Sequence, residues 1–212
     1  GPTVLPLRDF ALVLLICLCW AGNFLASAQA LQHFPPFLFT ALRLLAVGLL
    51  LLRFLRPVPR PLVPRLIFVA LCNGALHFGF NFWAIQAAGD ISSVALSLQS
   101  YIPMTALLAW ALLGEKPSLG SGIGTAIAFC GVAVLAFDPL VLDAPQALIL
   151  SLLAAITLAL GTVLLRRLPG LHTFQLQAWT AVISVPPLLL TSLLIEPVDV
   201  ALFSEAGWMD WG

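Results

Sequence analysis

The sequence contains few charged residues for its length. Only 8% of the 212 residues are Asp, Glu, Lys or Arg, whereas 61% are hydrophobic, and the mean hydropathy is +1.09. Because a typical soluble domain carries about 25% charged residues, this composition excludes a water-soluble surface. The formal net charge is zero, which gives no reason to expect nucleic acid as a partner. The sequence therefore predicts that the lipid bilayer is the main partner of the chain.

Acidic side chains are absent from the long apolar stretches, and no metal-ligand pattern occurs in the sequence. A membrane-embedded enzyme would need paired carboxylates, a metal cluster or an activated nucleophile inside the bilayer. The four cysteines have no CxxC partner and no nearby His at ligand spacing, which favours a role as small apolar packing residues. The sequence thus predicts a protein that is not an enzyme and that holds neither cofactor nor metal.

Seven apolar segments approach the length needed to cross a membrane. A hydrocarbon core of about 30 Å requires roughly 20 helical residues. The expected spans are residues 10–31, 37–55, 66–88, 92–113, 119–137, 147–167 and 173–195. This pattern predicts an all-α fold, a polytopic transmembrane helix bundle.

The charges between the expected spans alternate from one loop to the next. The basic residues that fall at one end are Arg8, Arg53, Arg56, Arg60, Arg65, Lys116, Arg166 and Arg167. The loops at the opposite end have no Lys or Arg and carry Asp90, Asp138, Asp143, Glu196, Asp199 and Glu205. Because cytoplasmic loops collect Lys and Arg, we expect a multi-pass protein of the cell inner (plasma) membrane with a cytoplasmic N-terminus.

The chain divides into two parts after the fifth expected span. Segments 37–41 and 174–178 share a weak pattern at one common offset. Five spans per copy would insert the second copy in the opposite sense, and inverted repeats are typical of secondary transporters. We expect a first five-helix repeat at 1–138 and the start of a second, inverted repeat at 139–212. Residues 208–212, with paired Trp, are expected to begin an eighth span, so the second repeat would be truncated.

Polar side chains lie at similar depth in four of the expected spans. A polar group at membrane depth is costly and normally faces a partner or a cavity. The residues predicted to line a central substrate site are Asn23, Arg43, His77, Asn81 and Gln99. Ser100 lies beside Gln99, and Asn73 shares the four-residue spacing of His77 and Asn81, which places those three on one helix face.

Arg43 and His77 have the clearest chemistry in this set. Arg43 is the only charged residue deep in an apolar segment, so its guanidinium is expected to meet a substrate carboxylate or to snorkel to the outer interface. His77 is expected to bind substrate or to carry a coupling proton. The alternative for His77 is a neutral ring tied to Asn73, Asn81 or a backbone carbonyl.

Gly and Pro residues predict local breaks and contacts. Pro103 and the pair Pro186-Pro187 lie near mid-membrane, where each predicts either an interrupted helix or a tolerated kink. Gly114 and Ser118 are expected to end one helix and cap the next. The small-residue face at Gly120, Gly124 and Ala128 predicts close helix packing, within the chain or between subunits.

Several of these segments together resemble the EamA family of the drug/metabolite transporter superfamily. The similarity runs through residues 20–24, 36–43, 100–110, 113–118 and 122–135. The resemblance implies ten helices in two inverted repeats and export of small metabolites, such as amino acids or their derivatives, by alternating access. It also implies that Arg43 belongs to the family's second-helix signature. Subunit pairing into a homodimer is one way to complete a site shared by both repeats.

Two alternative functions stay open at this point. A non-transporting membrane subunit would act only through helix packing, which the small-residue face would serve. Within the same superfamily, the substrate could instead be a nucleotide sugar or a lipid-linked sugar.

Overall fold

The computed structural model describes residues 4–88 and 90–196, and its regular structure in these residues is entirely helical. The helices are α1 (Leu7–Ala30), α2 (Pro36–Leu50), α3 (Val63–Ala70), the π-helical segment η3 (Leu71–Leu76), α4 (His77–Ala87), α5 (Ile91–Leu98), α6 (Tyr101–Leu113), α7 (Leu119–Ala136), α8 (Pro139–Leu142), α9 (Pro145–Leu165) and α10 (Thr173–Ile195). Two 3-10 turns lie between α2 and α3, at Leu52–Phe54 and Arg60–Leu62.

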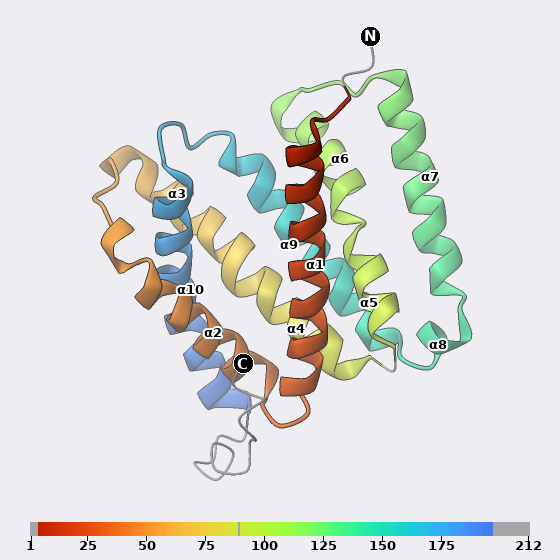
Figure 1. Cartoon of the computed structure of the whole chain (residues 1–212), viewed down its shortest axis with the longest axis horizontal. Helices are drawn as coiled ribbons and strands as arrows, with labels where there is room; N and C mark the ends of the chain where they lie inside the picture. Colours follow the sequence, from red (N-terminus) through yellow and green to blue (C-terminus); the bar gives the residue numbers. More distant parts are fainter. Residues whose placement is uncertain (1–3, 89, 197–212) are drawn as a thin grey trace.

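Six helical stretches within the described residues are long and apolar enough to cross a membrane, and α2 is a shorter apolar helix. The elements run up and down between two ends of the bundle (Figure 1). The predicted all-α, multi-pass membrane architecture is therefore confirmed. Residues 208–212, where an eighth span was predicted, and the acidic residues Asp199 and Glu205 lie outside the described residues.

The loops that carry basic residues lie together at one end of the bundle, here called the basic end. In Figure 1 this end also holds the N-terminal end of α1. Arg65 donates a hydrogen bond to the carbonyl of Arg167 (3.3 Å), and Arg167 donates to the carbonyl of Leu112 (2.9 Å). Arg166 forms an ion pair with Glu115. The chain thus alternates between ends in the order that the loop charges predicted.

The second span is shorter than expected because its helix ends at the start of the basic loop. α2 stops at Leu50, and a 3-10 turn follows in which Arg53 places its guanidinium carbon 4.9 Å from the centre of the Phe54 ring. Pro57 and Pro59 follow in the same loop, where a proline disfavours continuation of the helix because it lacks the backbone N–H and clashes with the preceding turn.

The fourth span is interrupted between α5 and α6, four residues before Pro103. Pro103 has no N–H to offer the carbonyl of Gln99, which accepts instead from the N–H of Ile102 (3.1 Å). Of the two alternatives for Pro103, the structure has the interrupted helix. Pro186 and Pro187 do not interrupt their helix, because both lie inside the continuous helix α10. They are therefore tolerated, which is the other alternative.

α7 begins with the predicted cap, and two glycines of its small-residue face are open in the described chain. Gly114 ends α6 with φ of 69°, and the Oγ of Ser118 accepts from the N–H of Ser121 (3.2 Å). Both local predictions are confirmed. A Cβ added at Gly120 or Gly124 would meet nothing within 4 Å. These two glycines therefore have no close neighbour among the described residues, and packing of the small-residue face against another subunit stays a prediction.

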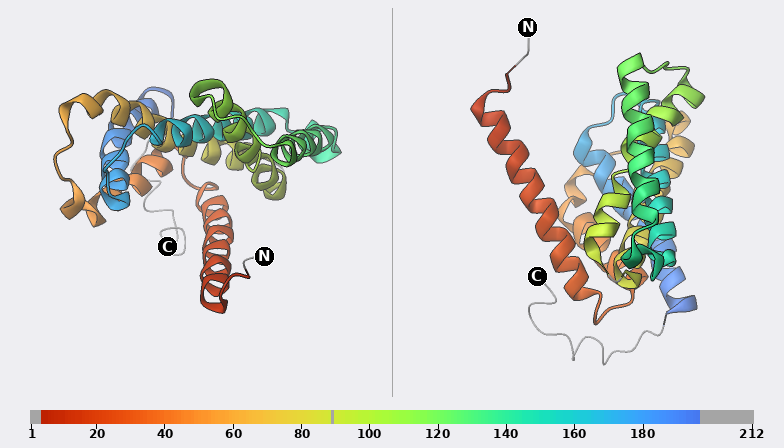
Figure 2. Two further views of the ribbon diagram at one scale, coloured as in Figure 1. Left: turned by 90° about the horizontal axis from the view of Figure 1, so that it is seen from above. Right: turned by 90° about the vertical axis from the view of Figure 1, so that its right-hand side faces the viewer.

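Packing is concentrated around α9 and α10. The third span, formed by α3, η3 and α4, packs against α9, and α2 packs against α10. By contrast, the only buried residues of α1 are Ser27 and Ala30, and α7 has no buried residue in the described chain. Figure 2 shows α1 leaning away from the other helices. The amide of Gln86 on α4 holds the C-terminal end of α1 by donating to the carbonyls of Leu31 (3.2 Å) and Phe34 (3.5 Å).

Candidate functional site

A cleft of about 670 Å³ lies between α1 and α2, within the membrane-spanning part of the chain. Asn23 and Ser27 line it from α1, and Arg43 lines it from α2. Phe34 and Phe39 contribute aromatic walls. The cleft thus combines one cationic group, two neutral polar groups and an apolar surface, a combination typical of small-molecule sites.

Arg43 connects α1, α2 and α4 through its guanidinium group. One terminal nitrogen donates to the Oγ of Ser27 (3.3 Å), and the guanidinium carbon lies 5.2 Å from the centre of the Phe82 ring. Ser27 in turn donates to the Oδ1 of Asn23 (3.5 Å). Within residues 4–88 and 90–196, no carboxylate forms an ion pair with Arg43. At membrane depth a cationic side chain normally faces a partner group or a water-filled cavity.

Phe82 gives the guanidinium group a fixed platform. Its ring is almost fully buried, at 1% exposure, and packs edge-on against Phe39 with ring centres 5.1 Å apart. Phe78 stacks on it at 5.9 Å. A guanidinium over an aromatic face gains roughly 0.5–2 kcal/mol. The position of Arg43 therefore depends on the rotation of α4, which carries Phe82 and Phe78.

His77 and Asn73 face α9 rather than the α1–α2 cleft. The Nδ1 of His77 lies 2.9 Å from the carbonyl oxygen of Ala154. Because a carbonyl only accepts, Nδ1 must donate the hydrogen in this contact. This is the backbone-carbonyl alternative expected for His77. Asn73 packs against Gly161 so closely that a Cβ at Gly161 would overlap its carboxamide. His77 and Asn73 thus both face α9.

Asn81 and Gln99 lie in different surroundings. Asn81 is buried on α4, and its Oδ1 has no hydrogen-bond partner among the described residues. Gln99 is exposed and lines a separate cleft between α5 and α7, together with Ser100. The structure therefore brings Asn23 and Arg43 together, places His77 against α9, buries Asn81 on α4, and puts Gln99 in a different cleft. A substrate role for each of the five stays a prediction.

Sequence reasoning missed Ser27 and Phe82. Ser27 follows Asn23 by four residues, so the spacing rule that grouped Asn73, His77 and Asn81 would also have found it. Phe82 carried no such signal, because it is one of 14 phenylalanines and only its place beneath Arg43 distinguishes it.

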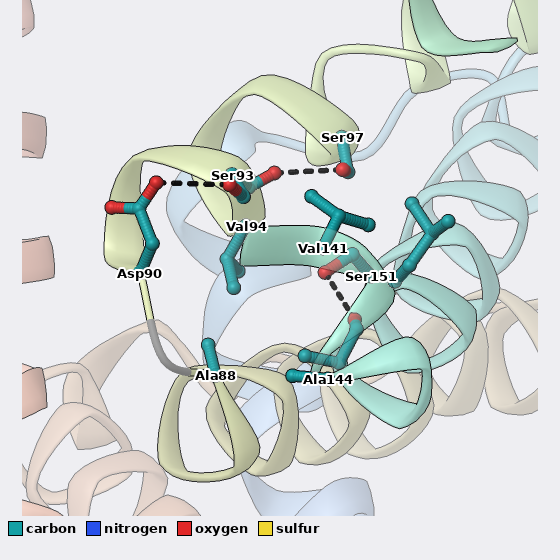
Figure 3. Close-up of a pocket in the computed structure, with 10 residues that line it drawn as sticks. Ala88, Asp90, Ser93, Val94, Ser97, Val141, Ala144 and Ser151 are labelled. Atoms are coloured by element: carbon teal, nitrogen blue, oxygen red, sulfur yellow. Dashed lines mark hydrogen bonds between the residues drawn. The ribbon is translucent and has the colours of Figure 1, made fainter. Parts of the chain in front are cut away.

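Two further hollows lie at the end opposite the basic end. One is a cavity between α5 and α9, whose lining residues are drawn in Figure 3. Its volume is about 10 Å³. Ser97 and Ser151, which line it, donate to carbonyls of their own helices at 2.7 Å. This volume is at the lower limit for one water molecule, so the cavity has no room for a metabolite. The other is a cleft of about 450 Å³ beside Glu196.

Glu196 joins the end of α10 to the start of α2. Its Oε2 accepts from the N–H of Phe37 (3.2 Å) and its Oε1 from the N–H of Leu38 (3.0 Å). These N–H groups belong to the first helical turn, where a carboxylate is favoured. Burial nevertheless raises the pKa of Glu196 above its usual value, although the two backbone donors lower it. No local sequence pattern predicts this contact, because 158 residues separate Glu196 from Leu38.

Metal-ligand clusters are not found in the part of the chain that the structure describes: no group of three or more His, Cys, Asp or Glu side chains could hold an ion there. The chemistry available in the α1–α2 cleft is therefore recognition by one guanidinium, an amide, a hydroxyl and aromatic rings.

The chain belongs to the EamA-like transporter family, whose model matches residues 9–137, more than half of the sequence. Membership of this family marks it as a transporter-family protein and not an enzyme. The resemblance to the EamA family noted in the sequence is therefore confirmed as family membership. No solved structure matches the chain.

Two curated proteins are similar over most of the chain. A "Probable amino-acid metabolite efflux pump" of Salmonella typhimurium (strain LT2) is 31% identical over 200 residues, which cover 91% of this chain and 66% of that protein. An "Uncharacterized transporter YvbV" of Bacillus subtilis (strain 168) is 30% identical over 174 residues, which cover 76% of this chain and 54% of that protein. The chain thus spans somewhat less than two thirds of one relative and about half of the other.

Proposed function

We propose that the protein is a secondary transporter that exports small metabolites, such as amino acids or their derivatives, by alternating access. The observation that carries the proposal is the Arg43 guanidinium, which faces a membrane-depth cleft with no carboxylate partner in the described chain. The name of the Salmonella relative supports the substrate class. In this function Arg43 binds the carboxylate of the substrate, and Asn23 and Ser27 provide neutral polar contacts.

We further propose that the basic end faces the cytoplasm of a cell with this protein in its inner membrane. The support is the collection of basic loops at one end and the acidic loops at the other, since Lys and Arg resist translocation. Export would then carry substrate from the basic end toward the end where Glu196 joins α10 to α2.

The decisive test is transport by protein expressed from its full reading frame and reconstituted into liposomes. A panel of labelled amino acids and their N- or O-acylated derivatives is loaded inside, and efflux is followed with and without Arg43→Gln. A hydrogen bond to a charged group contributes about 1.5–3 kcal/mol, so efflux of the carboxylate substrate should fall at least about tenfold.

Arg53→Gln is the matched control for this test. Arg53 also places its guanidinium over an aromatic ring, that of Phe54, but it does so in the basic loop outside the cleft. Efflux should therefore stay near the wild-type rate in Arg53→Gln. Equal loss in both variants, or full efflux in Arg43→Gln, would contradict the assignment of the cleft.

The open face of α7 supports one second candidate, a membrane subunit that acts by helix packing. Gly120, Gly124 and Gly131 have no neighbour within 4 Å of an added Cβ, and such faces allow close helix contact in membranes. This function predicts a stable complex, including a homodimer, that Gly124→Leu dissociates in detergent, together with no efflux of any compound in the panel.

A further inference from the structure

The third span contains a π-helical segment at Leu71–Leu76, between α3 and α4. A π turn pairs residues five apart, is rare, and occurs inside α-helices mostly at functional sites. The segment lies within the membrane span Arg60–Ala87. Because no bulk water reaches that depth, the wider turn has to be stabilised by neighbouring protein groups.

Ser184 of α10 supplies such a group. Its hydroxyl accepts a hydrogen bond from the N–H of Ala75 (3.1 Å) and donates one to the carbonyl of Ala70 (3.1 Å). These two backbone groups are five residues apart, which is the pairing distance of a π turn. Ser184 is completely buried. Its hydroxyl therefore bridges one π turn from the neighbouring helix.

Glycines allow α9 and α10 to hold the π segment from two sides. A Cβ at Gly74 would overlap the Oγ of Ser184 and would lie 2.9 Å from the Cγ2 of Thr180, both on α10. On the α9 side, Asn73 occupies the space in which a Cβ of Gly161 would lie. The contacts at both sides thus depend on the absence of a side chain.

The rotation of α4 beyond the π segment determines where Phe82 points. One residue of α-helical register corresponds to about 100° of rotation. If the π turn closed to an α turn, α4 would rotate relative to α3, and the Phe82 ring would leave its place 5.2 Å from the Arg43 guanidinium.

We propose that Ser184 is a positioning residue, whose hydroxyl holds the π turn of the third span and thereby sets the rotation of α4 that places Phe82 beneath Arg43. α10 is in this way coupled to a cleft that it does not line. During transport, withdrawal of the hydroxyl would rotate α4 and change the wall of the cleft. That last step rests on the proposed function, whereas the control of helix register does not.

The test measures helix register directly. Spin labels are placed at Ile67 on α3, which is exposed, and at Ala87 on α4, which is half-buried, on opposite sides of the π segment. The full-length protein is studied in lipid nanodiscs by pulsed electron resonance. Ser184→Ala, which removes the hydroxyl, should shift the main label distance. Gly74→Ala, which displaces the same hydroxyl from the other side, should shift it toward the same value.

Two matched controls distinguish loss of the Ser184 hydrogen bonds from a general disturbance of helix packing. Ser151→Ala removes an equally buried hydroxyl, but Ser151 donates only to the Ala147 carbonyl of its own helix (Figure 3). Gly48→Ala adds the same methyl group against α10, where the nearest atom, the Cβ of Ala181, lies at an ordinary 3.6 Å. Both controls should keep the wild-type distance.

An unchanged distance in folded Ser184→Ala would overturn the proposal, and so would an equal shift in Ser151→Ala. If Ser184→Ala does not fold, the same distance is measured in Ser184→Cys. A thiol is a weaker donor and acceptor than a hydroxyl, so it should weaken the bridge without removing the side chain. A partial population at the shifted distance supports the bridge, and wild-type distances alone refute it. Efflux should fall severalfold in Ser184→Ala but not in Ser151→Ala. If the wild type exports no compound, the proposed function is wrong. The label distances still show whether Ser184 controls the register of α4.

Discussion

The region where the third span meets α9 and α10 is much more closely packed than α1, although the helices of both are long and apolar enough to cross a membrane. In the first region, helices touch through Gly, Ala and Ser, and polar groups such as His77 and Ser184 bond across helices. α1 is nearly all exposed in the described chain. Because lipid solvates either helix well, apolar surface alone does not drive their association. Close contacts and buried hydrogen bonds therefore fix helix positions in the first region, and α1 has few of them.

The largest expected effect comes from closing a space in the packed region. Gly161→Val places a branched side chain where the Asn73 carboxamide lies. Overpacking costs about 1–3 kcal/mol or more, so little protein should fold, as measured by fluorescence-detected gel filtration and the thermal midpoint. Gly124→Val is the control, because α7 has open space at that position. A similar loss of folded protein in both variants would show that the helix propensity of valine, and not packing, is responsible.

A smaller effect is expected when one hydrogen bond between the third span and α9 is removed. His77→Ala loses the donor to the Ala154 carbonyl. The loss of a buried hydrogen bond, together with the space left by the ring, should cost about 1–3 kcal/mol. This should be visible as a lower thermal midpoint.

The same position tests whether His77 carries a coupling proton. His77→Asn keeps a side-chain donor, so the pH profile of efflux should keep its wild-type shape in this variant. A profile that loses its dependence on pH near neutrality would instead support the coupling-proton alternative, since His titrates in that range.

The comparison also explains what could be predicted from the sequence. Span number, loop alternation and the break near Pro103 follow from apolar length, charge and the missing N–H of proline, which are local properties. The grouping of Asn23 with Arg43 was predictable because one short loop joins α1 to α2. Gln99 could not be placed, because its direction depends on how the chain bends at the interruption between α5 and α6. The Ser184 bridge depends on residues more than a hundred positions apart.

A still smaller effect is expected in the contact between α1 and the rest of the chain. Ser27→Ala removes the hydroxyl that accepts from Arg43 and donates to Asn23. Interhelical hydrogen bonds in membranes contribute about 1 kcal/mol or less on average, so the thermal midpoint should change little. Efflux at low substrate concentration should fall severalfold, because Arg43 loses one restraint. A large drop in stability would mean that α1 is held far more firmly than its exposure indicates.

The smallest expected effect is the pH dependence contributed by Glu196, the contact that joins α10 to α2. Because burial raises its pKa above the usual 4.5, the folded protein binds this proton more tightly than the unfolded chain does. The contribution of Glu196 to stability is therefore greatest below the unfolded pKa and is lost as the pH rises through the folded pKa. Relative to Glu196→Gln, which does not titrate, the wild type should lose thermal stability as the pH rises from about 4. The difference between the two melting curves isolates this group, because every other titrating residue is shared. A difference that grows with pH in favour of the wild type would show that the two backbone donors of α2 outweigh burial and make Glu196 a stabilising cap in its charged form.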